Sequence, residues 1–349
     1  MQQPKVRNSN LELYRIIVML LIVIHHYVVN SGLMPLMDTD PLNMKSVFLY
    51  LWGMWGKTGI NCFVLITGYF MCKSEITLKK FLKLLLEVLF YSFTINLCFM
   101  AFGYGDISMG EFLWRLLPVH SISQDFTGCY LVFFLFIPFL NVLVRNLSKR
   151  QHQLLLALCL GVYTLWSTIP SIDINTNYVT WFCILFILGS YLRIYPYKED
   201  NTRFWVIASS CSIILAMSSV LAMLWLRRYG SNYGVYALVA DSYKPFAVLV
   251  SVCVFMLFKS IKLKHSKWIN TIGGGTFGVL LIHANNNTMR QWLWKDVCNN
   301  AGYYATDAIF LHALLIPLLV FSVCSLIEYV RMKTIEQPLL EFVYRKIRG

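Results

Sequence analysis

The first apolar run, residues 11–30, carries four ionisable side chains: Glu12, Arg15, His25 and His26. A run of this length is typical of a transmembrane helix, in which ionisable side chains are costly and usually functional. On a helix, Glu12, Arg15 and His26 fall within an arc of about 80°, whereas His25 points about 100° away. Arg15 and His26 are separated by about 16 Å along the axis. The run predicts one polar face, with a cation near one membrane surface and an imidazole beyond the middle of the membrane.

An imidazole at that depth has to line a polar cavity or find a hydrogen-bonding partner, because the bilayer core offers no water. We therefore interpret His26 as a functional residue and His25 as its structural neighbour. Glu12 and Arg15 lie about one turn inside the membrane edge. At that position, helix capping and snorkelling explain the charges as well as a functional role does.

Lys80 and Lys83 form a second charged group at the start of the apolar run 80–102. They lie three residues apart, hence on one helix face, and Arg15 is expected at the same depth. Together these cations can hold a phosphate-bearing ligand on the cytosolic side. Ordinary positive residues flanking a membrane span produce the same pattern, and Lys83 can instead pair with Glu87 on the next turn.

The composition places the chain among integral membrane proteins, because 58% of its 349 residues are hydrophobic and only 13% are charged. The net charge of +13 does not indicate nucleic-acid binding, since the basic residues lie in short clusters between apolar runs, without a nucleic-acid-binding motif. The ten cysteines lie singly within apolar runs, which is typical of packing and predicts no disulfide framework and no metal site. The first run lacks a cleavage site, so we expect an uncleaved anchor.

The expected fold is an all-α, polytopic membrane helix bundle with about ten transmembrane helices. The predicted spans are residues 11–32, 46–71, 80–102, 127–145, 153–170, 178–195, 204–226, 244–261, 272–289 and 305–330. An even number of spans puts both termini on one side, and most of the 30 lysines and arginines fall on that side, so both termini are expected to be cytoplasmic. The expected organisation is a single membrane domain over residues 1–349 in the inner (cytoplasmic) membrane, with a short cytoplasmic tail at 331–349 and no appended soluble domain.

The longest outward loop, residues 103–126, contains a helix-capping pattern at Ser108 and Glu111. This pattern predicts a short amphipathic helix at the outer membrane interface. No internal repeat and no inverted pair of glycine-broken helices, features that mark many secondary transporters, occurs in the sequence.

Four further polar residues lie in or beside the predicted spans. Asn61 is an intramembrane amide that needs a partner, although helix packing explains most of its segment. His283 and Asn285 lie toward the outer half of the ninth span, where they suit either a sugar-binding rim or a polar helix exit. Glu336 precedes Pro338 on the cytoplasmic side, where a juxtamembrane turn is the simpler interpretation.

These segments, taken in order, resemble the membrane acyltransferase-3 superfamily, which includes bacterial enzymes that O-acylate cell-surface polysaccharides. The matching segments are Glu12 to Arg15 followed by His26, the glycine-bounded block 59–70, residues 128–131, Ile282-His283, and Glu336 to Pro338. The chain departs from the family pattern at three places. Lys80 and Lys83 replace two common arginines, with loss of the bidentate fork. Glu12 replaces the usual aspartate, and Tyr130 replaces a common tryptophan.

The resemblance implies an enzyme that transfers an acyl group from cytosolic acyl-CoA, used as a co-substrate, to a sugar hydroxyl of a lipid-linked or cell-surface glycan. No permanently bound cofactor, metal or nucleic-acid partner is expected, and membrane lipid surrounds the chain. The implied catalytic residue is His26, as general base or transient acyl carrier. The implied donor-binding residues are Glu12, Arg15, Lys80 and Lys83. The implied acceptor-side or supporting residues are His283, Asn285, Asn61 and Glu336.

Two other functions fit the polar helix face. A polytopic transporter of a small solute or glycan precursor would use buried ionisable groups without making a bond. The absence of repeat symmetry and the placement of cations on one side count against a transporter. A sensor or assembly scaffold would make the same polar face purely structural.

Overall fold

The computed structural model describes residues 8–117, 126–169, 176–196, 201–230 and 233–338, together with Ile172 and Ile174. All regular elements within these segments are helices, which confirms the all-α fold. The α-helices are α1 (Ser9–Val29), α2 (Leu33–Thr39), α3 (Met44–Gly53), α4 (Gly56–Met71), α5 (Leu78–Ala101), α6 (Met109–Arg115), α7 (Phe126–Asn146), α8 (Lys149–Leu160), α9 (Tyr178–Ile194), α10 (Thr202–Arg227), α11 (Pro245–Ser260), α12 (Lys267–Gly274), α13 (Thr276–His283), α14 (Asn287–Gln291), α15 (Asn300–Tyr303) and α16 (Ile309–Arg331). Short π- or 3-10-helical segments are η1 (Gly161–Leu165), η2 (Trp166–Thr168), η3 (Trp292–Val297) and η4 (Met332–Glu336).

Within the described segments, five helical segments are long and apolar enough to cross a membrane. They are Ser9–Val29, Leu78–Ala101, Phe126–Asn146, Thr202–Arg227 and Ile309–Glu336. Two further apolar helices, α9 and α11, are shorter, with 17 and 16 residues. The remaining expected spans fall on interrupted helices: 46–71 is divided into α3 and α4, 153–170 into α8, η1 and η2, and 272–289 among α12, α13 and α14. The structure therefore shows a membrane-type helix bundle, and the number ten remains a prediction.

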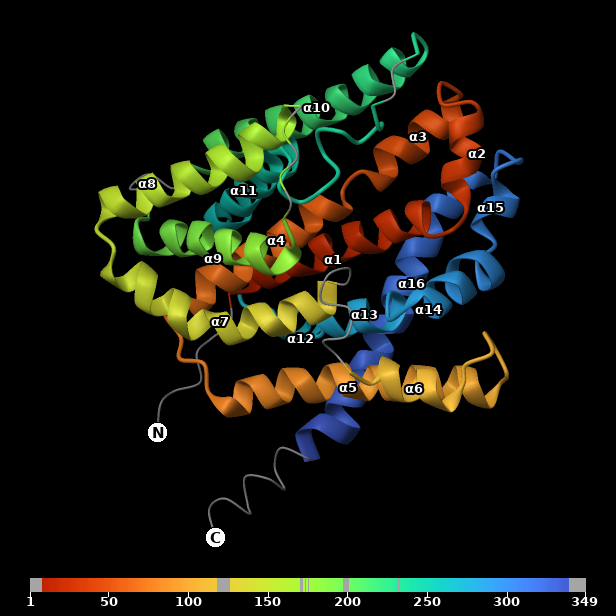
Figure 1. The fold of residues 1–349 in the computed structure, drawn as a ribbon, viewed down its shortest axis with the longest axis horizontal. Coiled ribbons are helices and arrows are strands. Elements are labelled where there is room, and N and C mark those ends of the chain that lie inside the picture. Colours follow the sequence, from red (N-terminus) through yellow and green to blue (C-terminus); the bar gives the residue numbers. More distant parts are fainter. Residues whose placement is uncertain are drawn as a thin grey trace.

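Helix α1 lies in the middle of the bundle, with α5 along one edge and α8 and α10 along the opposite edge (Figure 1). It packs against α3, α4, α11, α12, α13 and α16. Its inner residues, among them Met19, Val23 and Tyr27, have no exposed surface. The helix with the charged face thus lies in the interior of the bundle.

The break between α3 and α4 lies against α1 and supplies a hydrogen-bonding group to it. The carbonyl oxygen of Gly53, the last residue of α3, accepts a hydrogen bond from Nδ1 of His25 at 2.6 Å. Gly56 opens α4 directly beside the same ring, and a side-chain carbon at this position would overlap the imidazole. Glycine at the break therefore lets α1 approach closely enough for His25 to use the freed carbonyl.

Helices α4 and α9 also approach each other through glycine. A side-chain carbon on Gly68 would lie 2.8 Å from Cα of Phe186, and one on Gly189 would lie 2.7 Å from the carbonyl oxygen of Leu65. Both neighbours are backbone atoms, which cannot rotate away. The predicted role of the glycines of residues 59–68 in close helix packing is confirmed at Gly68.

Gly189→Ala should destabilise the protein by about 1–3 kcal/mol, because the added methyl group overpacks a backbone contact between two helices. Thermal unfolding of the detergent-solubilised protein measures this change. Gly161→Ala is the matched control, since it adds the same methyl group to a helical position with open space around it. Equal unfolding temperatures for Gly189→Ala and the wild type would contradict the role assigned to this contact.

The predicted interfacial helix is present as α6, and the side chain of Ser108 caps it by accepting a hydrogen bond from the backbone N–H of Glu111 at 3.2 Å. Arg115 at its other end donates to Asn96 of α5. In the same loop, Tyr104 donates a hydrogen bond to Asp296, which raises the pKa of the Tyr104 hydroxyl to about 12. The loop is thus fixed to the elements around it. Residues 118–125 of the predicted loop lie outside the described residues.

All ten cysteines are free thiols in the structure. Within the described segments no three His, Cys, Asp or Glu side chains converge in a way that would hold a metal ion. The expected tail at 331–349 begins as a continuation of α16, because η4 extends the helix to Glu336. Residues 339–349 of that tail lie outside the described residues.

Candidate functional site

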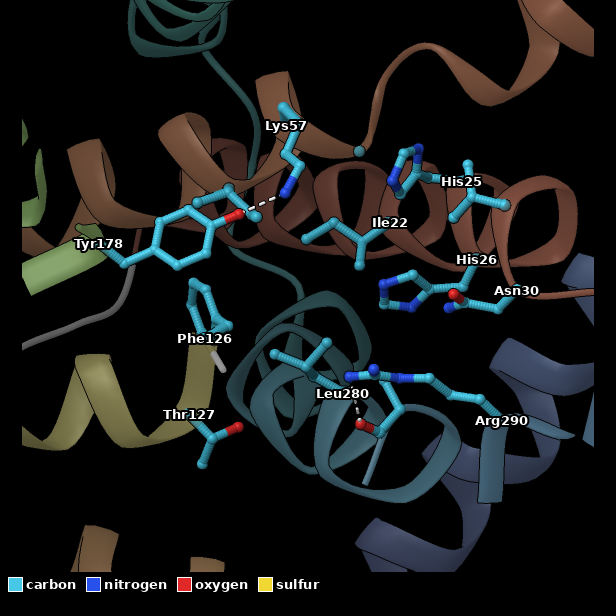
Figure 2. Close-up of a pocket in the computed structure, with 14 residues that line it drawn as sticks. Ile22, His25, His26, Asn30, Lys57, Phe126, Thr127, Tyr178, Leu280 and Arg290 are labelled. Carbon is cyan, nitrogen blue, oxygen red and sulfur yellow. Dashed lines mark hydrogen bonds between the residues drawn. The ribbon is translucent and has the colours of Figure 1, made fainter. Parts of the chain in front are cut away.

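A cavity of about 230 Å³ opens where α1 ends and α4, α7 and α9 begin (Figure 2). The last turn of α1 contributes His25, His26 and Asn30, and α4 contributes Lys57. The opposite wall contains Arg290 of α14. The other lining residues are Ile22, Val29, Gly56, Ile60, Phe126, Thr127, Tyr178, Leu280 and Ala284. The two histidines of the first apolar run therefore do face a polar cavity, whereas Glu12 and Arg15 do not line it.

The structure pairs His26 with His283, which lies 257 residues later in the chain. Nδ1 of His26 is 3.0 Å from Nε2 of His283. Nδ1 of His283 is 2.6 Å from the carbonyl oxygen of Val279, one turn earlier on α13. His283 is fully buried, whereas His26 is only partly buried and lines the cavity. The two imidazoles form a relay that ends on a backbone carbonyl.

The carbonyl oxygen of Val279 determines which ring nitrogens of His283 and His26 carry a proton when both rings are neutral. A carbonyl oxygen only accepts hydrogen bonds, so Nδ1 of His283 carries a proton and its Nε2 keeps a lone pair. That lone pair accepts from His26, so Nδ1 of His26 carries a proton as well. The remaining ring nitrogen of His26, Nε2, is left with its lone pair. The relay thus prepares His26 to accept a proton from a molecule in the cavity.

His25 also lines the cavity, although helical phase predicts that it points away from His26. Its ring centre is 5.7 Å from that of His26. The prediction considered α1 alone, whereas the cavity extends around the helix to the break between α3 and α4. His25 nevertheless remains tied to Gly53 and Gly56, in agreement with a structural role.

On the side of the cavity that faces the N-terminal half of α1, three aromatic side chains form a layer. Phe63, Tyr130 and Phe277 lie one turn beyond lining residues of α4, α7 and α13, respectively, and all three are at least 91% buried. The ring of Tyr130 is 5.9 Å from that of Phe63 and 5.6 Å from that of Phe277. The Tyr130 hydroxyl is 3.0 Å from that of Thr67. The three aromatic side chains thus pack against one another next to the cavity.

The predicted donor-binding cations each have a partner in the structure. Nη1 of Arg15 is 3.5 Å from a carboxylate oxygen of Glu12. Nζ of Lys80 donates to the hydroxyl of Ser74 at 2.6 Å and to the carbonyl oxygen of Glu75 at 2.5 Å. None of these side chains lines the cavity with His26.

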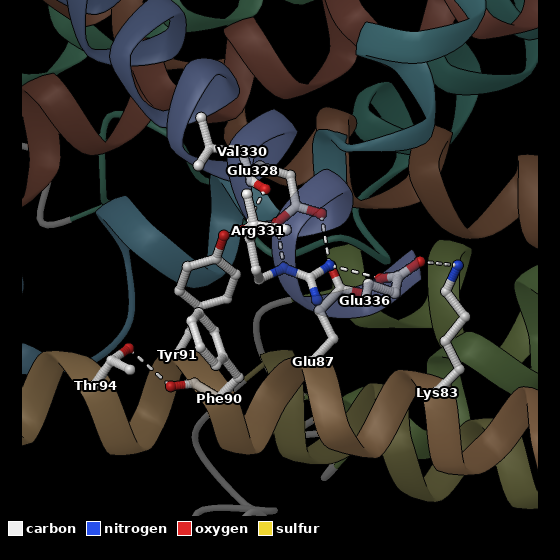
Figure 3. A network of polar contacts seen from close by, with 10 residues as sticks. Lys83, Glu87, Phe90, Tyr91, Thr94, Glu328, Val330, Arg331 and Glu336 are labelled. Atoms are coloured by element: carbon white, nitrogen blue, oxygen red, sulfur yellow. Dashed lines mark hydrogen bonds and ion pairs between the residues drawn. The ribbon is translucent and has the colours of Figure 1, made fainter. Parts of the chain in front are cut away.

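Lys83 forms an ion pair with Glu336 at 2.5 Å, so the alternative of a helical pair between Lys83 and Glu87 is wrong. Glu336 is part of a buried charge network around Arg331 (Figure 3). Arg331 lies 2.8 Å from Glu328, 2.8 Å from Glu336 and 3.7 Å from Glu87. The network joins α5 to the end of α16 and to η4, which is more than the juxtamembrane turn expected at Glu336.

Glu328 is the innermost member of this network, with 1% of its surface exposed. The hydroxyl of Tyr91 on α5 donates to it at 2.6 Å. Gly278 of α13 packs directly on its carboxyl group, and a side-chain carbon there would overlap Glu328. Sequence patterns did not single out Glu328 or Arg331, and named Glu87 only as a partner for Lys83, although an intramembrane charge is itself the signal.

Asn61 and Asn285 do not line the cavity. Asn61 donates to the carbonyl oxygen of Ser242 at 2.6 Å and accepts from the indole of Trp181 at 2.9 Å. Asn285 donates to the carbonyl oxygen of Leu281 at 2.9 Å, as a side chain that caps the end of α13. Asn61 thus finds the partner that its position requires, between α4, α9 and the segment before α11.

The cavity residues that the sequence analysis did not single out include Lys57, Tyr178 and Arg290. The signal for Lys57 was present, since it is a cation within a predicted span. Arg290 follows the ninth span, where it reads as an ordinary loop cation, and only the packing of α14 places it beside α1.

A family model described as an acyltransferase domain, that of the acyltransferase-3 family, matches residues 8–328. The match covers α1, which carries His26, and α13, which carries His283. No curated protein and no solved structure matches the chain.

Proposed function

This chain belongs to the acyltransferase-3 family and is a membrane acyltransferase, and on that basis we propose that it transfers an acyl group from acyl-CoA to a hydroxyl of a cell-surface or lipid-linked sugar. The observation that carries the proposal is the relay from Val279 through His283 to His26 at a polar cavity. We further propose the inner membrane as its location, with ten spans and both termini on the cytoplasmic side. In that topology the cavity lies toward the outer side.

In the proposed reaction, Nε2 of His26 takes the proton of the sugar hydroxyl as its oxygen attacks the thioester carbonyl carbon. The new C–O bond forms, the C–S bond breaks, and the proton passes to the leaving CoA thiolate. General-base assistance of this kind contributes about 10²- to 10⁴-fold to the rate. His283 holds the proton of His26 on Nδ1 and so keeps Nε2 available.

The donor is proposed to approach from the cytosolic end, where Arg15, Lys80 and Lys83 lie under the proposed topology. Phosphate oxygens of CoA would replace the present partners of these cations. The pantetheine arm would then pass the layer formed by Phe63, Tyr130 and Phe277. Arg15 and His26 are about 16 Å apart along α1, a distance that the extended pantetheine arm of CoA can span.

Family membership decides between the enzyme and the transporter interpretations. A direct test uses membranes that contain the full chain, the surface glycan of the producing cells, and either acetyl-CoA or succinyl-CoA with a radiolabelled acyl group. Label is expected on the glycan with at least one donor, and membranes from cells without the gene are the control. Label that stays on CoA with both donors would contradict the proposed function.

Replacing His283 with leucine should lower the rate of acyl transfer by about 10²-fold, because Nδ1–H of His26 loses its acceptor and the ring is free to carry its proton on Nε2. His283→Gln should recover part of this loss, since its amide oxygen can accept the same hydrogen bond. Initial rates at matched membrane abundance, measured across a range of pH, separate the two variants. Equal initial rates of His283→Leu and His283→Gln at every pH would show that His283 does not position His26.

A further inference from the structure

The cavity beside His26 contains two cations that come from different parts of the fold. Lys57 reaches it from the first turn of α4, and Arg290 reaches it from α14. Figure 2 shows the two side chains extending toward the cavity from opposite sides. Both are only partly buried, so a molecule in the cavity can contact them.

The partners of both cations in the described segments are neutral groups. Lys57 donates to the hydroxyl of Tyr178 and lies 5.1 Å from the centre of that ring. Arg290 donates to the side-chain oxygen of Asn287 at 3.1 Å and to the carbonyl oxygen of Ala284 at 3.2 Å. Among the described residues, neither cation has a carboxylate within ion-pair distance, and no carboxylate lines the cavity.

Arg290 also has an unused donor. Its Nε is buried and has no hydrogen-bond partner within the part of the chain that the structure describes. A buried N–H without an acceptor is costly, and a cation in a membrane protein is normally paired. A bound anion would give this N–H a hydrogen-bond acceptor and would give the cation a negative partner.

The two cations are more than a neutral sugar requires. Side chains that can both donate and accept, such as those of Asn30, Thr127 and Tyr178 in the same lining, are sufficient for neutral hydroxyls. Lysine and arginine only donate, and they carry a charge. Two unpaired cations on opposite walls instead suit a carboxylate or a phosphate, which accepts charge-assisted hydrogen bonds from both.

We propose that Lys57 and Arg290 bind an anionic group, a carboxylate or a phosphate, carried next to the reacting atoms by the acceptor sugar or by the transferred acyl group. This inference rests on the proposed function and narrows its substrate class. On the acceptor, the anion would belong to an acidic or phosphorylated sugar. On the acyl group, it would be the free carboxylate of a dicarboxylic acid.

The first test is mass spectrometry of the surface glycan from cells that produce the full chain, compared with cells that lack the gene. The expected product carries the new acyl group on an acidic or phosphorylated residue, or carries a dicarboxylic acyl group. A neutral acyl group on a neutral, unphosphorylated sugar would overturn the inference while leaving the proposed function intact. Failure of any acyl group to move from CoA would overturn both.

The second test measures kinetics with Lys57→Gln and Arg290→Gln at matched membrane abundance. Loss of one charge-assisted contact should raise KM for the anionic substrate by about 10- to 100-fold. If the acceptor supplies the anion, KM for the acceptor rises and a neutral analogue is used equally by variant and wild type. If the acyl group supplies the anion, the wild type should have a lower KM for succinyl-CoA than for acetyl-CoA. The glutamine variants should lose this difference.

Lys295→Gln is the matched control, because Lys295 is an exposed cation five residues after Arg290 and does not line the cavity. Its kinetics should equal those of the wild type. Arg290→Lys and Lys57→Arg keep the charge and should recover part of the lost affinity. An increase in KM for acetyl-CoA alone, or no change in either glutamine variant, would overturn the inference.

Discussion

Replacing His26 with alanine should lower acyl transfer by about 10²- to 10⁴-fold, the contribution of a well-placed general base. The variant removes the only imidazole that both lines the cavity and donates to His283, among the residues that the structure describes. The remaining cavity can fill with water, and Nε2 of His283 keeps a neutral lone pair that water can satisfy. The protein should therefore fold normally while losing activity.

Transfer of label from acetyl-CoA to the glycan, normalised to membrane abundance, measures the effect of His26→Ala. His312→Ala is the matched control, because His312 is another partly buried imidazole, bonded to Tyr27 at 2.7 Å and to the carbonyl oxygen of Cys298 at 3.1 Å, and lies outside the cavity. This control should lose stability more than activity per folded molecule. Wild-type activity in His26→Ala would eliminate the proposed catalytic role.

Replacing Arg331 with leucine should destabilise the protein by about 3–5 kcal/mol, the usual cost of breaking a buried ion pair. Arg331 is 93% buried among the carboxylates of Glu87, Glu328 and Glu336. Without the guanidinium, three carboxyl groups remain close together with Lys83 as the nearby cation. Their mutual repulsion and their buried position both act against the folded state.

The unfolding temperature and the yield of monodisperse protein in detergent measure the effect of Arg331→Leu. Lys333→Leu is the matched control, since Lys333 is an exposed cation two residues later. Combining Arg331→Leu with Glu328→Gln should recover part of the loss, because one of the uncompensated charges is removed. Equal stability of Arg331→Leu and Lys333→Leu would show that the network does not hold α5 to α16.

Local sequence patterns predicted the elements that depend on nearby residues. The ionisable face of residues 11–30 follows from composition and helical periodicity, and its His26 end does line a polar cavity. The helix after Ser108 follows from a capping pattern, because the cap and the N–H that it accepts from are only three residues apart. The order of short motifs along the chain was sufficient to indicate the acyltransferase-3 family, which the family match confirms.

Span limits were less predictable, because hydropathy does not register a break inside an apolar run. Residues 46–71 form two helices, since Gly53 and Gly56 have to admit α1 and His25 at the break. Likewise, the pairing of Lys83 depends on where η4 lies in space. A helical pair with Glu87 is available in the sequence, but Glu336 is the residue that α16 and η4 bring to it.

The sequence by itself determined that His26 is a polar group on the inner face of a membrane helix, because helical phase and membrane depth are set by local composition. Only the tertiary structure decided its partners. His283 lies 257 residues away in the chain, and Lys57 and Arg290 come from α4 and α14, which are distant in the chain and contribute to one cavity. Such contacts depend on the close approach of glycine-bearing helices and on the satisfaction of buried polar groups across the whole bundle, which no local periodicity encodes.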